Sequence, residues 1–231
     1  MIIYGKNTVK EAVLAKRKFH KLWLDEKNTD AKVKQFFDYN TINYRMTSKH
    51  ELNLMTKDQN HQGMVAEVED YLYTPLESLF DGTIKQVLIL DQVEDPHNLG
   101  AIIRSAEAVK IDAIIIAKNR SAEINPTVAK IAVGALEYVK VIQVGNLVQT
   151  IKKLKDNGFW VVGTDLDTDK TYHELDPNVS QAVIIGNEGT GMSRLVKLSC
   201  DYLVKIPMVG KVNSLNASVA AALLMYQMKK L

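Results

Sequence analysis

From residue 84 onward, short runs of consecutive apolar residues alternate with segments in which apolar residues recur every three or four positions. Continuous apolar runs are typical of strands buried on both faces, and the periodic segments are typical of helices. The predicted strands are 87–91, 113–117, 139–142, 159–164, 182–186 and 202–206. The predicted helices are 99–109, 126–133, 147–157, 192–198 and 213–230. This alternation predicts an α/β fold with a mostly parallel sheet covered by helices on both faces.

The first 72 residues carry a second, shorter pattern. Helical spacing covers 7–16 and 31–39, and extended patterns cover 21–24, 43–46 and 63–69. Ser48 and Glu51 have the spacing of a capping box and predict another helix start. These elements predict a small α/β domain.

The pattern weakens between the two regions, where Pro75, Asp81 and Gly82 interrupt it. We therefore predict a domain at 1–72, a linker at 73–83 and a larger domain at 84–231.

Composition alone does not point to a partner. The chain has 231 residues, 46% of them hydrophobic, and a net charge of only +2. Residues 1–49, however, hold 11 Lys and Arg against 5 Asp and Glu. An ordinary charged surface explains this excess of Lys and Arg about as well as an RNA-binding face does. The excess therefore only supports an RNA-binding function that other features must establish.

The cysteine, the histidines and the apolar runs argue against disulfide-bonded, metal-binding and membrane-spanning classes of protein. The single cysteine, Cys200, excludes an internal disulfide and a zinc cluster built on cysteines. The five histidines show no pair at metal-ligand spacing, so no metal site is expected. No apolar run approaches the length needed to cross a membrane, and the first residues do not resemble a leader. We expect a cytoplasmic protein with no membrane partner.

Three stretches, each of which includes the end of a predicted strand and the residues after it, contain most of the candidate polar residues. They are LDQVEDPHNLGAIIRSAEA (90–108), VIIGNEGTGM (183–192) and VKIPMVGKVNSLNASVAAALLMY (204–226). Ligands of parallel α/β sheets usually bind at the carboxyl ends of the strands, where all three stretches would lie.

The glycine-rich stretch 186–191 invites a nucleotide interpretation that its spacing does not support. It lacks the G-x-G-x-x-G pattern of dinucleotide folds and the lysine and hydroxyl residue of a P-loop, and Glu188 would place a carboxylate among phosphates. A cationic ligand suits it better. A tight turn that needs glycine is the alternative.

Several polar residues in these stretches have structural alternatives. Asn98 could be the N-cap of the first helix, and Arg104 could pair with Glu107. Asn213 or Ser214 could cap the last helix, with Asn216 in its first turn.

Together the three stretches resemble the motifs of the SpoU (TrmH-type) RNA 2′-O-ribose methyltransferases. The segments YGKNTVKEA (4–12) and HQGMV (61–65) also resemble the amino-terminal domain of the members that act on ribosomal RNA. The resemblance implies a deep trefoil knot of the SPOUT type in the larger domain, an RNA-binding smaller domain, and a homodimer. It implies S-adenosyl-L-methionine as cofactor.

The resemblance also assigns roles to residues. The cofactor site would involve backbone and side-chain groups of Thr164, Gly186, Asn187, Gly189, Ile206, Met208 and Leu215. The catalytic candidates are Arg104, Asn98, Glu188, Ser214 and Asn216. An arginine side chain is a poor general base at neutral pH, so Arg104 is expected to hold RNA phosphate and stabilise developing negative charge. Proton removal by the substrate phosphate, by water or by Glu188 stays open.

The leading hypothesis is methyl transfer to a ribose 2′-hydroxyl of 23S ribosomal RNA, at a guanosine. A transfer-RNA methyltransferase is the nearest alternative. A non-catalytic RNA-binding or ribosome-assembly protein and a nicotinamide-dependent enzyme are the others. The combination of Asn98, Arg104, Glu188 and Asn216 argues against the former, and the missing G-x-G-x-x-G argues against the latter.

Overall fold

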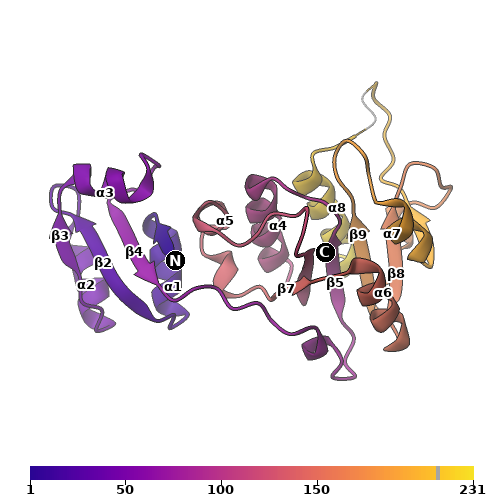
Figure 1. Ribbon diagram of the computed structural model, residues 1–231, viewed down its shortest axis with the longest axis horizontal. Coiled ribbons are helices and arrows are strands. Elements are labelled where there is room, and N and C mark those ends of the chain that lie inside the picture. Colours follow the sequence, from indigo (N-terminus) through magenta and orange to yellow (C-terminus); the bar gives the residue numbers. More distant parts are fainter. Residues whose placement is uncertain (212–213) are drawn as a thin grey trace. The chain divides into compact units, whose positions relative to one another are not determined.

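The computed structural model describes residues 1–211 and 214–231, which form two compact units (Figure 1). The first unit comprises Met1–Leu72 and Ile124–Tyr138, and the second comprises Tyr73–Glu123 and Val139–Leu231. Each unit has a sheet of its own.

The first unit is a four-stranded sheet with helices. Its strands are β1 (Ile2–Tyr4), β2 (Phe19–Asp25), β3 (Arg45–Thr47) and β4 (Met64–Val68), in the order β1-β4-β2-β3. Only the β2–β3 pair is parallel. The helices are α1 (Lys6–Leu14), α2 (Ala31–Tyr39) and α3 (Lys49–Thr56). The sequence pattern did not predict β1, whose three residues are too few to show an alternation.

Helix starts in this unit follow local capping chemistry. Asp30 accepts a hydrogen bond from the Val33 N–H at 2.8 Å, and Ser48 accepts one from the Glu51 N–H at 3.2 Å. Each side chain thereby satisfies one of the N–H groups that the first turn of a helix leaves unpaired.

The segment Ile124–Tyr138 has its contacts within this first unit, although the sequence-based division assigned it to the domain 84–231. It contains α5 (Pro126–Ile131) and the short 3₁₀ helix η2 (Ala135–Glu137). The guanidinium of Arg17 pairs with the Glu137 carboxylate at 2.8 Å, and both side chains are nearly buried. Such a long-range ion pair leaves no periodic signal in the sequence.

The second unit has a six-stranded sheet in which every neighbouring pair is parallel, as the pattern predicted. Its strands are β5 (Gln86–Leu90), β6 (Ala113–Ala117), β7 (Val141–Val144), β8 (Trp160–Thr164), β9 (Gln181–Ile185) and β10 (Tyr202–Val204). The order is β10-β8-β9-β5-β6-β7. β5 and β9 at its centre are buried at every residue, which explains their continuous apolar sequences.

Helices cover both faces of this sheet (Figure 1). On one face, α6 (Leu147–Asp156) and α7 (Arg194–Ser199) enclose a core with alternate strand residues such as Val87, Ile89 and Ile115. On the other, α8 (Ala217–Lys229) packs against β5, β9 and α4 (Pro96–Ala108). One-turn 3₁₀ helices, η1 (Leu76–Leu79) and η3 (Tyr172–Glu174), lie in connections. Over the described residues, no helix combines the length and apolarity that a membrane crossing requires.

Two helix starts differ from the sequence prediction. Asp95 caps α4 by accepting from the His97 N–H at 2.8 Å, and Pro96 takes the first helical position, so Asn98 lies in the first turn and is not the cap. Asn216 caps α8, accepting from the Ser218 N–H at 3.0 Å, so Ser214 is not its cap. Asn213 lies outside the described residues.

His61, just before β4, is buried and hydrogen-bonded at both ring nitrogens. Its Nδ1 accepts from the Gly63 N–H at 3.0 Å, so its Nε2 carries the proton and donates to Asn53 Oδ1 at 2.8 Å. Burial lowers the pKa of His61, the nearby Asp25 carboxylate opposes this, and Lys49 adds to the lowering. The ring is therefore held neutral.

We predict that the first unit loses stability as the pH falls through about 6.5, the usual pKa of histidine. The unfolded chain takes up a proton there that the folded His61 resists, so acid favours unfolding. Trp160→Phe leaves Trp23 as the sole tryptophan, whose fluorescence reports this unit. The unfolding temperature should fall between pH 7 and pH 5, and His61→Gln should flatten the change. Equal slopes in both proteins would contradict the assignment.

Candidate functional site

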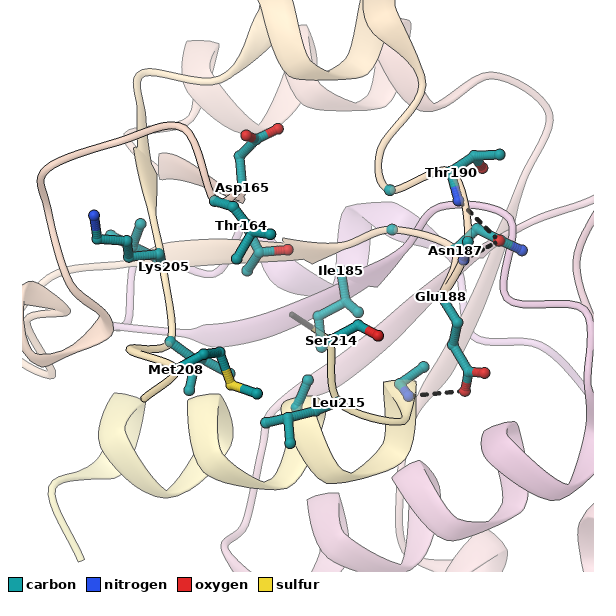
Figure 2. A pocket seen from close by; sticks show the side chains of 18 residues that line it. Thr164, Asp165, Ile185, Asn187, Glu188, Thr190, Lys205, Met208, Ser214 and Leu215 are labelled. Atoms are coloured by element: carbon teal, nitrogen blue, oxygen red, sulfur yellow. Dashed lines mark hydrogen bonds between the residues drawn. The ribbon is translucent and has the colours of Figure 1, made fainter. Parts of the chain in front are cut away.

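A cavity of about 470 Å³ lies at the carboxyl ends of β8, β9 and β10, beside the first turns of α8 (Figure 2). Its walls come from the loop after β8, the glycine-rich loop after β9 and the segment between β10 and α8. The volume is in the range of small-molecule sites, and its position is the one that parallel sheets usually offer to ligands.

The fold brings most of the predicted site residues to this cavity. All seven cofactor candidates line it, namely Thr164, Gly186, Asn187, Gly189, Ile206, Met208 and Leu215, and so do Glu188 and Ser214. Asn98, Asn216 and Arg104 are not among its lining residues. The sequence interpretation did not select Asp165, Thr190, Lys205, Ala217 or Ala220, which also line it.

Asn187 organises the loop after β9. Its side-chain oxygen accepts from the Gly189 N–H at 2.9 Å, and its amide nitrogen donates to the Gln92 carbonyl at 3.0 Å. Gln92 has a positive φ of 62°, an uncommon conformation that presents this carbonyl after β5. The loop is closed by a pair of backbone hydrogen bonds between Asn187 and Gly191.

Two of the three glycines of this loop are required by the surrounding backbone. A Cβ at Gly186 would overlap the backbone of Gly191 and Met192, and Gly191 has a positive φ of 68°. At Gly189 a Cβ would meet only the Asn187 side-chain oxygen, at 3.5 Å. The protein's own backbone therefore explains Gly186 and Gly191, whereas Gly189, which lines the cavity, has no such requirement.

Three polar side chains, one from each motif, meet at the start of α8. Glu188 Oε1 accepts hydrogen bonds from Asn98 Nδ2 at 2.9 Å, from Asn216 Nδ2 at 2.8 Å and from the Ala217 N–H at 2.9 Å. Asn216 Nδ2 also lies 2.9 Å from Asn98 Oδ1. Figure 2 shows the Glu188 carboxylate directed at this helix end. A carboxylate in that position satisfies an unpaired N–H and interacts favourably with the helix dipole.

Glu188 has a structural role that the sequence did not indicate. The sequence interpretation offered it as a charge for a cationic ligand or as a general base. In the structure its Oε1 is a shared acceptor that fixes the loop after β9 against α4 and α8.

Arg104 lies on the exposed side of α4 and does not enter the cavity. Within residues 1–211 and 214–231 it has no ion pair, so the alternative pairing with Glu107 is not observed. Its guanidinium is thus available to a group outside this chain.

The loop after β8 is fixed by a further ion pair. Thr164 Oγ1 donates to the Ile184 carbonyl at 2.9 Å, and Asp165 pairs with Lys197 of α7 at 2.6 Å. Burial would raise the pKa of Asp165, but the hydrogen bonds from Lys197 and from the Asp167 N–H outweigh it and hold that pKa below its usual value. Asp165 directly follows the predicted strand 159–164, and this position was the signal that could have identified it.

The described residues give no support for a metal centre or a reactive thiol. In the part of the chain that the structure describes, no cluster of three or more His, Cys, Asp or Glu residues is arranged to hold a metal ion. Burial raises the pKa of Cys200 to about 11, so its thiol stays protonated at neutral pH.

Two family models match the chain. Residues 85–226 match the SpoU rRNA methylase family, and residues 2–74 match the RNA 2′-O ribose methyltransferase substrate-binding family. The two matches correspond to different parts of the chain and together cover most of it.

Individual relatives and structures agree with these matches. A putative TrmH family tRNA/rRNA methyltransferase, YacO, from Bacillus subtilis is 43% identical over 97% of this chain and 93% of its own length. A relative of the same description from Staphylococcus aureus is 43% identical over 98% of this chain and 94% of its own.

Among solved structures, the SpoU methyltransferase AviRb from Streptomyces viridochromogenes, in complex with AdoMet, covers all of this chain and 89% of its own with a TM-score of 0.85 at 23% identity. The TrmH/SpoU tRNA modifying enzyme of A. aeolicus covers 67% of this chain and 79% of its own, with a TM-score of 0.58 at 29% identity. The chain therefore belongs to the SpoU rRNA methylase family and is an RNA methyltransferase of the SpoU and TrmH type.

Proposed function

We propose that this protein methylates a ribose 2′-hydroxyl of 23S ribosomal RNA, at a guanosine, in the cytoplasm. The methyl donor is S-adenosyl-L-methionine, the cofactor bound in the AviRb complex. The 2′-oxygen attacks the methyl carbon, the carbon–sulfur bond breaks, S-adenosylhomocysteine leaves, and the hydroxyl proton is released. The observation that carries the proposal is the cavity at the carboxyl ends of β8, β9 and β10, bounded by residues from the second and third motifs.

Ribosomal RNA is favoured over transfer RNA by the first unit. Residues 2–74 match a substrate-binding family, whereas the A. aeolicus tRNA modifying enzyme aligns with only 67% of this chain. The curated relatives carry both substrates in their descriptions, so transfer RNA is the alternative that an experiment must separate.

The cavity suits the cofactor through backbone groups and apolar contact. Ile206, Met208 and Leu215 supply apolar surface, and the loop from Gly186 to Gly191 supplies polar backbone groups. Methyl transfer is an in-line displacement, so the positioning of the cofactor by these walls supplies much of the acceleration.

The catalytic groups divide into positioning and charge stabilisation. Glu188, Asn98 and Asn216 form one hydrogen-bonded unit that fixes the start of α8, and Ser214 lies beside it in the cavity wall. Arg104 would hold an RNA phosphate and stabilise the developing alkoxide. We assign proton removal to the substrate phosphate or to water, and to Glu188 the positioning of α8 through the three hydrogen bonds that its Oε1 accepts.

A homodimer would bring Arg104 of one chain to the cavity of another. The apolar face of α4, which consists of Leu99, Ile102, Ile103 and Ala106, is buried within the chain and offers no interface. The apolar surface available instead is a stripe on α8, formed by Val219, Leu223 and Tyr226, which are 48%, 39% and 47% exposed. Spacing of four and three residues puts them on one helix face, as a helix–helix interface requires.

The trefoil knot is a further part of the proposal. β10 is the edge strand, yet α8, which follows it, packs against β5 and β9 at the centre of the sheet. The chain between them therefore returns across the carboxyl ends of β8 and β9, the region where a knot of this kind would form.

Comparison of ribose methylation in cells with and without the protein tests the substrate. We expect one guanosine of 23S ribosomal RNA to lose its 2′-O-methyl group in the deletion strain and to regain it on complementation. Transfer RNA from the same cells should be unchanged. Loss of methylation confined to transfer RNA would establish the alternative substrate.

Substitutions at Glu188 test whether it positions or accepts a proton. Glu188→Gln keeps an oxygen acceptor and should retain activity within about tenfold, since the lost charge–dipole interaction is worth about 0.3 to 1 kcal/mol. Glu188→Ala removes the acceptor shared by three donors and should weaken S-adenosylmethionine binding, measured by calorimetry, by at least about tenfold. Glu94→Gln is the exposed control. A general base would instead show a hundredfold or larger loss in Glu188→Gln and an altered pH–rate profile.

Substitution of Arg104 tests its role and the dimer together. Arg104→Ala should keep cofactor binding and the dimer while lowering methylation about a hundredfold or more, the usual cost of removing one group that stabilises transition-state charge. Glu107→Ala, one turn further along α4, should leave activity unchanged.

Mixed dimers then show whether Arg104 acts across subunits. Combining Arg104→Ala chains with Ala220→Trp chains, whose cavity is filled, should restore activity at one of the two sites. A monomer in sedimentation, or exchanged dimers with no recovered activity, would refute the shared site.

A further inference from the structure

A second cavity, of about 580 Å³, lies wholly within the first unit. It is formed by the end of β2, the helix α3, the start of α1 and the segment 58–63 that leads into β4. The methyl-transfer chemistry of the second unit makes no use of it.

Carboxamide side chains dominate the walls of this cavity. Asn28, Asn53, Gln59, Asn60 and Gln62 all line it. A carboxamide both donates and accepts hydrogen bonds, which matches the mixed donors and acceptors on the edge of a nucleobase. The side chains of Gln59 and Asn60 have no hydrogen-bond partner among the described residues, so they are available to a ligand.

Two lysines border the same cavity. Lys6 and Lys49 line it from α1 and α3, and neither forms an ion pair within the described parts of the chain. Ammonium groups at the edge of a carboxamide-lined cavity match the phosphate of a nucleotide whose base enters it.

The floor of the cavity is fixed before any ligand binds. The buried Asp25 carboxylate accepts from Asn28 Nδ2 at 2.7 Å and from the Lys27 N–H at 2.9 Å. His61 is held between Asn53 and Gly63, as described above. These hydrogen bonds shape the site before a ligand binds, while Asp25 stays ionised and Asp58 adds a second carboxylate to the lining.

The backbone around the cavity adopts uncommon conformations. Lys57, Asp58 and Gln62 have positive φ angles of 52°, 59° and 53°. Non-glycine residues pay a conformational cost in that region, and such residues cluster at ligand sites. At Gln62 the side-chain oxygen accepts from the Lys6 N–H at 3.1 Å, which connects the segment 58–63 to the start of α1.

We infer that this cavity receives one unstacked nucleotide of the RNA substrate, with its base against the carboxamides and its phosphate on Lys6 and Lys49. The inference rests on the proposed function for the presence of RNA. A paired helix keeps its base edges inside the grooves, so the nucleotide must come from a loop, a bulge or a single strand. The first unit would then recognise the identity of an RNA base as well as the charge of the phosphate backbone.

Titration of the full-length protein with the four nucleoside monophosphates, followed by amide NMR, tests the site directly. We expect shifts at Asn53 and in 58–63 that differ between the bases, and smaller shifts with inorganic phosphate. Equal shifts with phosphate alone would reduce the cavity to a site for anions. Shifts confined to the second unit would overturn the inference.

Variants give an independent measurement with short single-stranded oligoadenylate, oligocytidylate and oligouridylate, by fluorescence anisotropy. Gln59→Ala combined with Asn60→Ala should weaken the preferred oligonucleotide about tenfold and reduce the preference among bases, as expected for two lost hydrogen bonds. Lys49→Ala should weaken all three alike and lower the salt slope by about 0.7. Gln149→Ala and Lys32→Ala, both exposed and outside the cavity, are the controls.

These outcomes separate the inference from the proposed function. Cofactor affinity should be unchanged in the Gln59 and Asn60 variant, which also shows that the chain is folded. Unchanged oligonucleotide binding in that variant would refute the nucleotide site even if ribosomal RNA is methylated. Base-dependent binding without any methylation would refute the proposed function and leave the site intact.

Discussion

The candidate site depends on one carboxylate placed at one helix end. Glu188 joins the loop after β9 to the first turn of α4 and to the start of α8 through a single oxygen atom. Without that acceptor, the Ala217 N–H and two side-chain amides would lose their common partner. The cavity wall formed by α8 would then no longer be held in a fixed position against the loop after β9. A charged acceptor is favoured there because the helix N-terminus carries partial positive charge.

The two cavities differ in the kind of molecule each can recognise. The one in the second unit combines apolar side chains with polar backbone groups, which suits a small cofactor held in a fixed orientation. The one in the first unit is lined mainly by side-chain amides, with two lysines and the acids Asp25 and Asp58, which suits a polar ligand with hydrogen-bond donors and acceptors along its edge. Under the two proposals, each unit has a separate recognition task, and substitutions in one cavity are expected to leave the other unchanged.

The sequence allowed the parallel sheet to be predicted because β5, β6 and β9 are almost entirely apolar and buried on both faces. It misplaced the helix starts because several candidate caps stood close together, and only geometry selected Asp95 and Asn216. The hydrogen bonds among Asn98, Glu188 and Asn216 join residues up to 118 positions apart, which no local pattern encodes. Recognition of the motifs identified these residues, but not their shared position at the start of α8.

The order in which the cavity is completed has a consequence during protein synthesis. β8 and β9 and their loops are made before the last wall of the cavity, which Leu215, Ala217 and Ala220 supply from near the end of the sequence. A nascent chain that has not released these residues from the ribosome has an open trough where the mature protein has a cavity. If the cavity holds the cofactor as proposed, tight binding requires that residues 215–220 have left the ribosome, and a product that ends before Leu215 lacks this wall.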